Sequence, residues 1–330
     1  MYYEAYQKKT KQQRRRRRRG PGEWLALGLA RLLAILLALA LLCAALLYAL
    51  PPSLFMVEPD ENTLSLTDGL PGSRINVLLL GTDVLKDNAQ RSDAMMIASI
   101  GYGSLKLTTV MRDILVDIPE HGRKKLNAAY AYGGPELVMR TLNETFGLNL
   151  MHYAQVDFVS LVELVDAIGG VEVSITEAER DLLNDTVRDS GRVFAPLGYT
   201  AHELLEYGEH VHLDGLQALA YARIRKLDSD YMRTSRQRAL LKTMVAKVRA
   251  NLWNPVLLTR LVRCALNAVN TNMSPLQLVS LGEKVLLSGE VDQLRLPVDG
   301  TFTDNGSSLE LQNRNANRSA FMRFAYESEP

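Results

Sequence analysis

Hydrophobic positions first gather in one uninterrupted run near the start of the chain. Residues 32–50 are all apolar apart from a single tyrosine, and Pro51 and Pro52 follow them directly. At about 1.5 Å per residue, a helix of this length spans nearly all of the bilayer's hydrocarbon core, which is about 30 Å thick. The pattern predicts a single transmembrane helix over residues 24–50. A cleaved signal peptide is the alternative, but no small-residue cleavage site stands at the end of the run.

A different pattern begins near residue 73, where short apolar runs alternate with longer amphipathic segments. Continuous apolar runs are typical of strands that are buried on both faces of a sheet, and the amphipathic segments are typical of helices that cover such a sheet. The runs expected as strands are "INVLLLGTD", "AMMIASI", "LKLTTVMRD", "YAQVDF", "VEVSI" and "VDQLRLPV". The segments expected as helices are 133–147, 159–170, 234–252 and 275–287. The alternation predicts an α/β fold, a three-layer α/β/α sandwich with a mixed sheet.

The charge distribution supports a membrane orientation. Residues 1–50 hold ten Lys and Arg against two Glu, so the rest of the chain carries a net −7 although the overall charge is +1. Basic segments beside a transmembrane helix stay in the cytoplasm, which predicts a cytoplasmic N-terminus and an extracellular body on the plasma membrane. The expected organisation is a basic tail (1–23), the transmembrane helix (24–50), a linker (51–72), an extracellular catalytic domain (73–300) and a C-terminal tail (301–330).

Charged residues mark the ends of the early predicted strands. Asp83 ends the first run and Arg112 the third, so both are expected at the carboxyl end of the sheet, where α/β folds bind ligands. Asp93 begins the second run and follows Arg91. It reaches the same edge only if its strand is antiparallel to the first, and the short intervening segment favours that arrangement. The neighbouring Asp113 is expected to form a buried ion pair that holds two strands.

The segment "YARIRKLDSDYMRTSRQR" (221–238) contains five arginines. Arg223 and Arg225 share one side of an extended segment, so a helix is expected to end near Ala222. A second set follows at helical i, i+3, i+4 spacing: Arg233, Arg236 and Gln237. Forked guanidinium groups suit phosphate oxygens, although ion pairs with nearby aspartates would explain the segment equally well when it is taken alone.

Together the two clusters predict a diphosphate site with a metal. Asp83 and Asp93 would repel each other without a cation between them, and hard oxygen ligands beside phosphate favour Mg²⁺ or Mn²⁺. Other classes of site have no support in the sequence. The five histidines form no zinc motif, and neither a nucleophile elbow nor a P-loop is present. Residues 1–23 contain no helix-turn-helix pattern, so no nucleic-acid partner is expected.

The order and spacing of several segments resemble the LytR-CpsA-Psr family of Gram-positive envelope proteins. The matching segments are "INVLLLGTD", "RSDAMMIASI", "VMRDILVDIP", "KKLNAAYAYGG", "HYAQVDFVSLVELVDAIGGVEV" and "LDGLQALAYARIRKLDSDYMRTSRQR". The resemblance covers roughly residues 73–240. One departure is Met232, where members of the family often have glycine, and it leaves the backbone conformation before Arg233 in question.

The resemblance implies a membrane-anchored phosphotransferase. Such a protein transfers a wall glycopolymer (teichoic acid, capsule or another polysaccharide) as glycosyl phosphate from an undecaprenyl-pyrophosphate carrier to peptidoglycan. It also implies that Asp83 and Asp93 hold Mg²⁺ and that an apolar tunnel encloses the lipid tail, with residues 158–168 and 239–262 as candidate walls. The residues implied to bind pyrophosphate are Arg91, Arg112, Arg223, Arg225, Arg233, Arg236 and Gln237. The residues expected to act in catalysis are Asp93, Arg112, Arg223 and Arg225. Two alternatives stay open, a hydrolase of polyprenyl diphosphates and a lipid-diphosphate sensor without catalytic activity.

Overall fold

The computed structural model describes residues 63–83, 92–101, 103–224 and 230–326. The predicted basic tail, the predicted transmembrane helix and most of the predicted linker lie outside these residues. Within the described ranges, no helix combines the length and the apolar character that a membrane span requires.

A six-stranded mixed sheet forms the centre of the described unit, as predicted. The strand order is β10-β3-β2-β1-β6-β9, in which β1 is parallel to β6 and antiparallel to β2, and β3 is antiparallel to β2 and parallel to β10. The strands are β1 (Ile75–Thr82), β2 (Ser92–Gly101), β3 (Ser104–Val110), β6 (His152–Asp157), β9 (Asn270–Thr271) and β10 (Val291–Leu296). Each of the long strands comes from one of the apolar runs.

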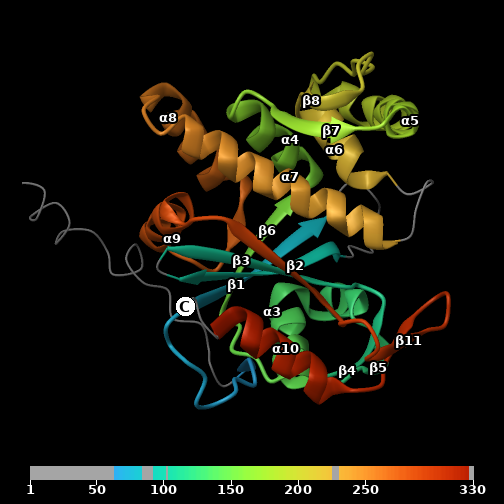
Figure 1. The fold of residues 1–330 in the computed structure, drawn as a ribbon, viewed down its shortest axis with the longest axis vertical. Coiled ribbons are helices and arrows are strands. Elements are labelled where there is room, and N and C mark those ends of the chain that lie inside the picture. Colours follow the sequence, from blue (N-terminus) through green and yellow to red (C-terminus); the bar gives the residue numbers. More distant parts are fainter. Residues whose placement is uncertain (1–62, 84–91, 102, 225–229, 327–330) are drawn as a thin grey trace, which may run out of the picture. The chain divides into compact units, whose positions relative to one another are not determined.

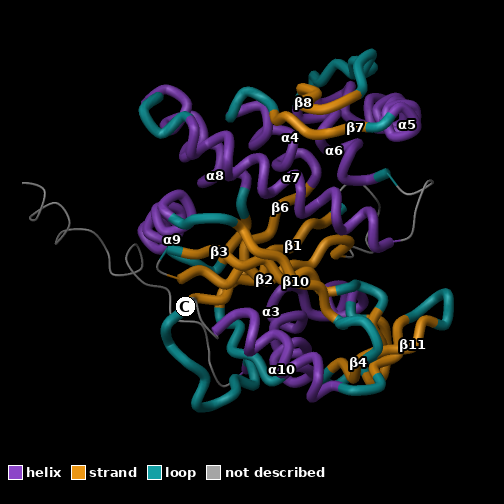
Figure 2. Tube along the Cα trace, in the orientation of Figure 1, coloured by secondary structure: helices purple, strands orange, loops and turns teal. Residues whose placement is uncertain are grey.

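Helices cover both faces of this sheet (Figure 1). α3 and α10 pack on one face, while α7 and α9 lie on the other, with α4, α6 and α8 beyond them (Figures 1 and 2). The helices are α3 (Asn127–Phe146), α4 (Phe158–Ala167), α5 (Glu177–Phe194), α6 (Gly215–Arg223), α7 (Asp230–Ala250), α8 (Pro255–Ala268), α9 (Pro275–Leu287) and α10 (Arg314–Tyr326). Two smaller sheets join β11 (Phe302–Asp304), β12 (Leu309–Leu311), β4 (Ile114–Ile118) and β5 (Gly122–Lys125), and β7 (Val171–Ile175) with β8 (Gly208–Leu213).

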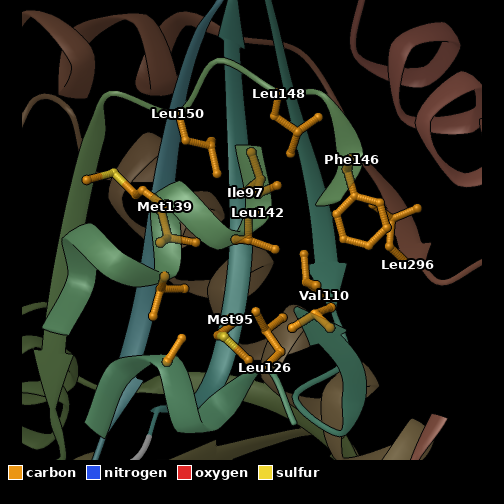
Figure 3. Packing of buried hydrophobic residues seen from close by; sticks show 14 of the residues in the cluster. Met95, Ile97, Val110, Leu126, Met139, Leu142, Phe146, Leu148, Leu150 and Leu296 are labelled. Atoms are coloured by element: carbon orange, nitrogen blue, oxygen red, sulfur yellow. The ribbon is translucent and has the colours of Figure 1, made fainter. Parts of the chain in front are cut away.

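The core on the α3 face follows from the alternation of side chains along the strands. Met95 and Ile97 of β2 point to this face and pack against Met139 and Leu142 of α3 (Figure 3). All four side chains are almost completely buried. The intervening residues of the same strands, such as Met96, face the opposite side. The sheet is therefore apolar on both faces, which explains its continuous hydrophobic runs.

Two boundaries differ from the sequence prediction. The helix expected over residues 133–147 begins earlier, at Asn127, and is kinked where Gly133 and Gly134 leave helical geometry, because Pro135 has no N–H to continue the ladder. Its predicted end is confirmed, with Gly147 in the left-handed conformation. Residues 301–326 were predicted to be a tail, but they form β11, β12 and α10. They belong to the folded domain, since Phe321 of α10 is fully buried in the hydrophobic core on the α3 face.

Candidate functional site

The antiparallel pairing of β1 and β2 brings the predicted acidic residues to one edge of the sheet. Thr82, the last residue of β1, pairs with Ser92 at the start of β2. Asp83 follows Thr82, and Asp93 follows Ser92. The second strand is antiparallel to the first, as Asp93 required in order to reach the edge where Asp83 lies. β3 runs antiparallel to β2 and ends at the same edge, and Arg112 lies two residues beyond its last residue.

A β-bulge controls the direction of Asp93. Gly81 pairs with Ala94 and Thr82 pairs with Ser92, so Asp93 is an extra residue without a partner on β1. Regular alternation would place Asp93 on the opposite face from Ala94, but both residues line the same cavity. An extra residue in one strand re-aims the neighbouring residues, and this bulge allows Asp93 and Ala94 both to line the cavity.

Arg112 lies between two carboxylates. Its Nη1 donates to Asp93 Oδ1, and its Nε donates to Asp113 Oδ2 at 3.4 Å. Lys125 of β5 donates to the other oxygen of Asp113 at 3.1 Å, so Asp113 joins two segments as predicted, but its side chain is partly exposed and not buried. Two cations and two anions thus balance, and the network fixes the guanidinium beside Asp93.

Arg223 is the last residue of α6 and reaches the same site from the opposite wall. Its Nη1 donates to Ser190 Oγ at 3.2 Å, and its guanidinium carbon lies 4.6 Å from the centroid of the Phe158 ring. Ile224 ends the helix with an extended backbone, close to the predicted end. The hydroxyl and the ring together hold the Arg223 side chain at the cavity wall. Arg91 and Arg225 lie outside the described residues.

Two of the three predicted residues of α7 line the cavity. Arg233, which is 2% exposed, donates from Nη2 to the backbone carbonyl of Asp93 at 3.5 Å. Gln237 donates from Nε2 to the Ala222 carbonyl at 3.5 Å. Its Oε1 is buried and accepts no hydrogen bond from any described residue. These contacts bring α7, α6 and the β2 bulge together at the polar end of the cavity.

Arg236 lies outside the cavity lining and points toward α5. Its Nε donates to Glu179 Oε1 at 2.9 Å, and its Nη1 donates to the Ile224 carbonyl at 3.3 Å. Burial raises the pKa of Glu179, but hydrogen bonds from the Thr176 backbone and from Arg236 outweigh this effect and leave the pKa below its ordinary value. In this conformation Arg236 fixes the backbone directly after Arg223.

The cavity itself lies between the sheet and helices α4, α6 and α7, and contains about 1120 Å³ of space including its opening. The charged and amide residues of its lining are Asp93, Asp157, Arg223, Arg233 and Gln237. The rest of the lining is mainly apolar and includes Leu161 and Leu164 of α4 together with Leu240, Leu241 and Met244 of α7. The ranges 158–168 and 239–262 were the candidate tunnel walls, and each contributes to this lining. The arrangement suits a ligand with a charged head and a long apolar tail.

The site supplies some of the oxygen ligands that a divalent cation requires. Within the described ranges, no group of three or more His, Cys, Asp or Glu side chains is arranged to hold a metal ion. Asp83 and Asp93 supply two carboxylates at one edge of the sheet. Magnesium is commonly held by one or two carboxylates together with substrate phosphates and water, so two carboxylates are a sufficient protein contribution.

Ser190 was not predicted from the sequence, and Phe158 was predicted only as part of the candidate tunnel wall over residues 158–168, not as a contact of Arg223. Phe158 directly follows β6, which is parallel to β1 and therefore ends at the same edge of the sheet. The rule that ligands bind at the carboxyl ends of strands could have identified it. Ser190 comes from the C-terminal part of α5, thirty-three residues before Arg223, and no sequence pattern marks it.

Comparisons with known proteins identify the family. Residues 58–321 match the model of the LytR_cpsA_psr family. Regulatory protein MsrR of Staphylococcus aureus (strain COL) is 31% identical, over 77% of this chain and 75% of its own length. The polyisoprenyl-teichoic acid–peptidoglycan teichoic acid transferase TagU of Enterococcus faecalis (strain ATCC 700802 / V583) is 36% identical, over 52% of this chain and 53% of its own.

Solved structures share the fold. The crystal structure of Bacillus subtilis TagT superposes with a TM-score of 0.60 at 23% identity, covering 82% of this chain and 96% of that one. The structure of the LytR-CPS2A-psr family protein YwtF (TagT) with bound octaprenyl pyrophosphate lipid gives a TM-score of 0.58 at 20% identity, with the same coverage of both chains. The family match and the fold agree, and this chain belongs to the LytR_cpsA_psr family.

Proposed function

We propose that the protein is a membrane-anchored transferase that moves a wall glycopolymer, as glycosyl phosphate, from undecaprenyl pyrophosphate to peptidoglycan. The observation that carries the proposal is the cavity, which joins a long apolar lining to one polar end with two guanidinium groups. A polyprenyl pyrophosphate has the matching division into an apolar tail and a charged head. The teichoic acid transferase among the relatives and the lipid-bound structure of a family member support this assignment.

The apolar lining would bind the prenyl tail through burial alone. Each square ångström of apolar surface removed from water contributes about 25 cal/mol, so a chain of many isoprene units gains affinity without any directional contact. Leu240, Leu241 and Met244 present one continuous side of α7 to such a chain, and Leu161 and Leu164 of α4 also line the cavity. The lining sets the tail's direction, and the polar end sets the position of the head.

The arginines would bind the pyrophosphate at that end. Arg223 is held in place by Ser190 and Phe158, so less side-chain freedom is lost when phosphate binds. Arg233 is buried beside it and adds a second positive charge in a site with little water. The family resemblance adds Arg91, Arg112, Arg225 and Gln237 to this set. It also implies Arg236, which in this structure pairs with Glu179 instead.

Asp83 and Asp93 would hold Mg²⁺, or Mn²⁺ in its place, against the phosphates. When bound, the cation supplies positive charge that offsets the charge developing on the leaving phosphate. Arg112 donates to one oxygen of the Asp93 carboxylate, and this bond fixes the direction of the other oxygen.

In the proposed reaction, a hydroxyl of peptidoglycan attacks the phosphorus nearest the sugar. A new oxygen–phosphorus bond forms, the bond between this phosphorus and the bridging oxygen breaks, and undecaprenyl phosphate leaves with that oxygen. The proton of the hydroxyl passes to one of the two carboxylates, Asp83 or Asp93. The arginines act in the transition state by neutralising the phosphate oxygens, and loss of one such donor lowers the rate by about 100- to 1000-fold.

The test compares two arginine variants in a transfer assay with a polyprenyl-pyrophosphate saccharide, Mg²⁺ and peptidoglycan fragments. Arg223→Ala is expected to lose about 100-fold or more of the transfer rate. Arg188→Ala is the control, since this exposed arginine of α5 pairs with Glu203 away from the cavity lining. Transfer by Arg223→Ala at the wild-type rate would refute the assignment of the site. Equal release of lipid phosphate with and without peptidoglycan would instead indicate a hydrolase.

A further inference from the structure

Helix α8 has an apolar side that packs on the protein and a second apolar stripe that does not. Leu258 and Leu261 face the core beside α4, with which α8 is in contact. Val256, Val262 and Leu266 lie on the outer side, with 66%, 46% and 47% of their surfaces exposed. A helix of a protein in water ordinarily turns polar residues to the outside, so this stripe indicates contact with something other than water.

The exposed stripe is accompanied by a tryptophan and two arginines. Trp253, two residues before the first residue of the helix, is 98% exposed. Arg260 and Arg263 lie on the outer side of α8, and neither forms an ion pair with a carboxylate in the described part of the chain. Tryptophan, exposed aliphatic side chains and arginine on one helix form the composition of helices that lie in the interface of a membrane.

The position of α8 agrees with such a role. The cavity lining follows α7 from Arg233 at the polar end to Met244 at the apolar end, and then includes Val269, directly after α8. In Figure 1, α8 and α9 accordingly lie at the left, and α7 begins at the right. The apolar end of the cavity therefore points toward the side of the molecule that carries α8.

The predicted transmembrane helix and the linker after it would keep this domain close to a bilayer. The predicted transmembrane helix ends at residue 50, and the linker over residues 51–72 reaches roughly 75 Å even when fully extended. The body of the protein beyond residue 50 carries a net −7. Two arginines that no carboxylate of the described residues pairs with give the α8 surface of an acidic body a local positive charge, which suits anionic lipid headgroups.

We propose that the α8 surface, composed of Trp253, Val256, Arg260, Val262, Arg263 and Leu266, docks onto an anionic phospholipid bilayer. The exposed side chains enter the interface, and the arginines contact the phosphate groups. Docking would place the apolar end of the cavity next to the hydrocarbon region, where a prenyl tail resides. The inference goes beyond the proposed reaction and does not depend on it, because the contact is measured without any turnover.

The chain contains only two tryptophans, Trp24 and Trp253, so one substitution makes Trp253 the only indole. The full-length Trp24→Phe protein is reconstituted in phosphatidylcholine vesicles with and without phosphatidylglycerol. In vesicles with phosphatidylglycerol, Trp253 fluorescence is expected to shift to shorter wavelength and to be quenched by lipids brominated near the headgroup. Arg260→Gln and Arg263→Gln should each lower the ratio of docked to free protein about five-fold, since a basic residue near an anionic surface contributes about that factor.

A matched control moves the tryptophan to another exposed apolar position. In the Trp24→Phe, Trp253→Phe background, Leu205→Trp replaces a side chain that is 84% exposed and lies outside α8. This reporter is expected to stay accessible to aqueous acrylamide and unaffected by brominated lipid. The proposal is overturned if Trp253 behaves as this control does. It is also overturned if Trp253 is shielded from acrylamide without quenching by brominated lipid, because that result assigns the surface to a second protein copy.

Discussion

Replacing Glu179 by alanine removes the carboxylate from the most deeply buried ion pair that is described around the site. Arg236 and Glu179 meet at 2.9 Å, and their side chains are 4% and 15% exposed. The other carboxylate oxygen accepts hydrogen bonds from the Thr176 backbone and side chain, which close the capping box of α5. The substitution therefore removes the Glu179 carboxylate from beside a buried guanidinium and opens the start of α5.

The expected loss of stability follows from these contacts. Removing one partner of a buried ion pair costs about 3–5 kcal/mol, since the remaining charge stays in a site with little water. Glu179 keeps some contact with solvent, which favours the lower end of this range. A domain of this size loses about 2–4 °C of Tm for each kcal/mol, so a fall of roughly 10 °C is predicted for Glu179→Ala.

The assay is thermal unfolding of the full-length protein, followed by circular dichroism. Glu203→Ala is the matched control, because Glu203 pairs with Arg188 at 2.7 Å but both side chains are about half exposed. Its Tm is expected to change little, since exposed ion pairs contribute little to stability. Equal Tm values for Glu179→Ala and wild type would refute the assignment of Arg236 to a buried structural pair.

Four further predictions concern the core, acid stability, the cavity and the arginine site. Leu78→Ala should lower the free energy of unfolding in urea by about 2–5 kcal/mol, because this β1 side chain is fully buried, and an unchanged midpoint would contradict the described core. The Glu179 carboxylate has a lowered pKa in the folded state, so its contribution is present above its ordinary pKa of 4.5 and is lost as the pH falls through the folded value. Glu179→Gln should remove that part of the acid sensitivity in unfolding curves measured against pH. Met244→Trp should fill the apolar end of the cavity and weaken binding of long-chain more than short-chain polyprenyl pyrophosphates, measured by calorimetry; equal weakening would place the tail elsewhere. Phe158→Leu should raise the KM for the lipid substrate several-fold through the lost contact with Arg223, and an unchanged KM would show that the ring does not position this arginine.

Much of the sheet could be predicted from the sequence because its strands are buried on both faces. Runs such as 75–83 and 94–100 have no polar side to face water, so burial between two helical layers was the consistent interpretation. The antiparallel return between them followed from the short connecting segment. The bulge at Asp93 could not be predicted, because it depends on the register between two strands and leaves no mark in the pattern of either.

Helical spacing predicted the site on α7 only in part. Arg233, Arg236 and Gln237 lie within one broad side of the helix, but the neighbours of that side differ across its width. Arg233 and Gln237 face the cavity, whereas Arg236 faces Glu179 of α5. Spacing gives the angle between side chains and does not identify the elements that pack against them. Spacing also fails to identify the buried side of α10. Asn317, Phe321 and Ala325 are all fully buried at i, i+4 spacing, but the polar Asn317 makes this side look less apolar in the sequence.

The central claim is that this site transfers glycosyl phosphate, and following the sugar-proximal phosphorus tests it most directly. A polyprenyl-pyrophosphate saccharide labelled at that phosphorus is incubated with the full-length protein, Mg²⁺ and peptidoglycan fragments. The account predicts that the label moves to peptidoglycan together with the saccharide, and that the movement is lost in Arg223→Ala. Label that leaves as free glycosyl phosphate at the same rate without peptidoglycan, or that moves equally fast in Arg223→Ala, would contradict it.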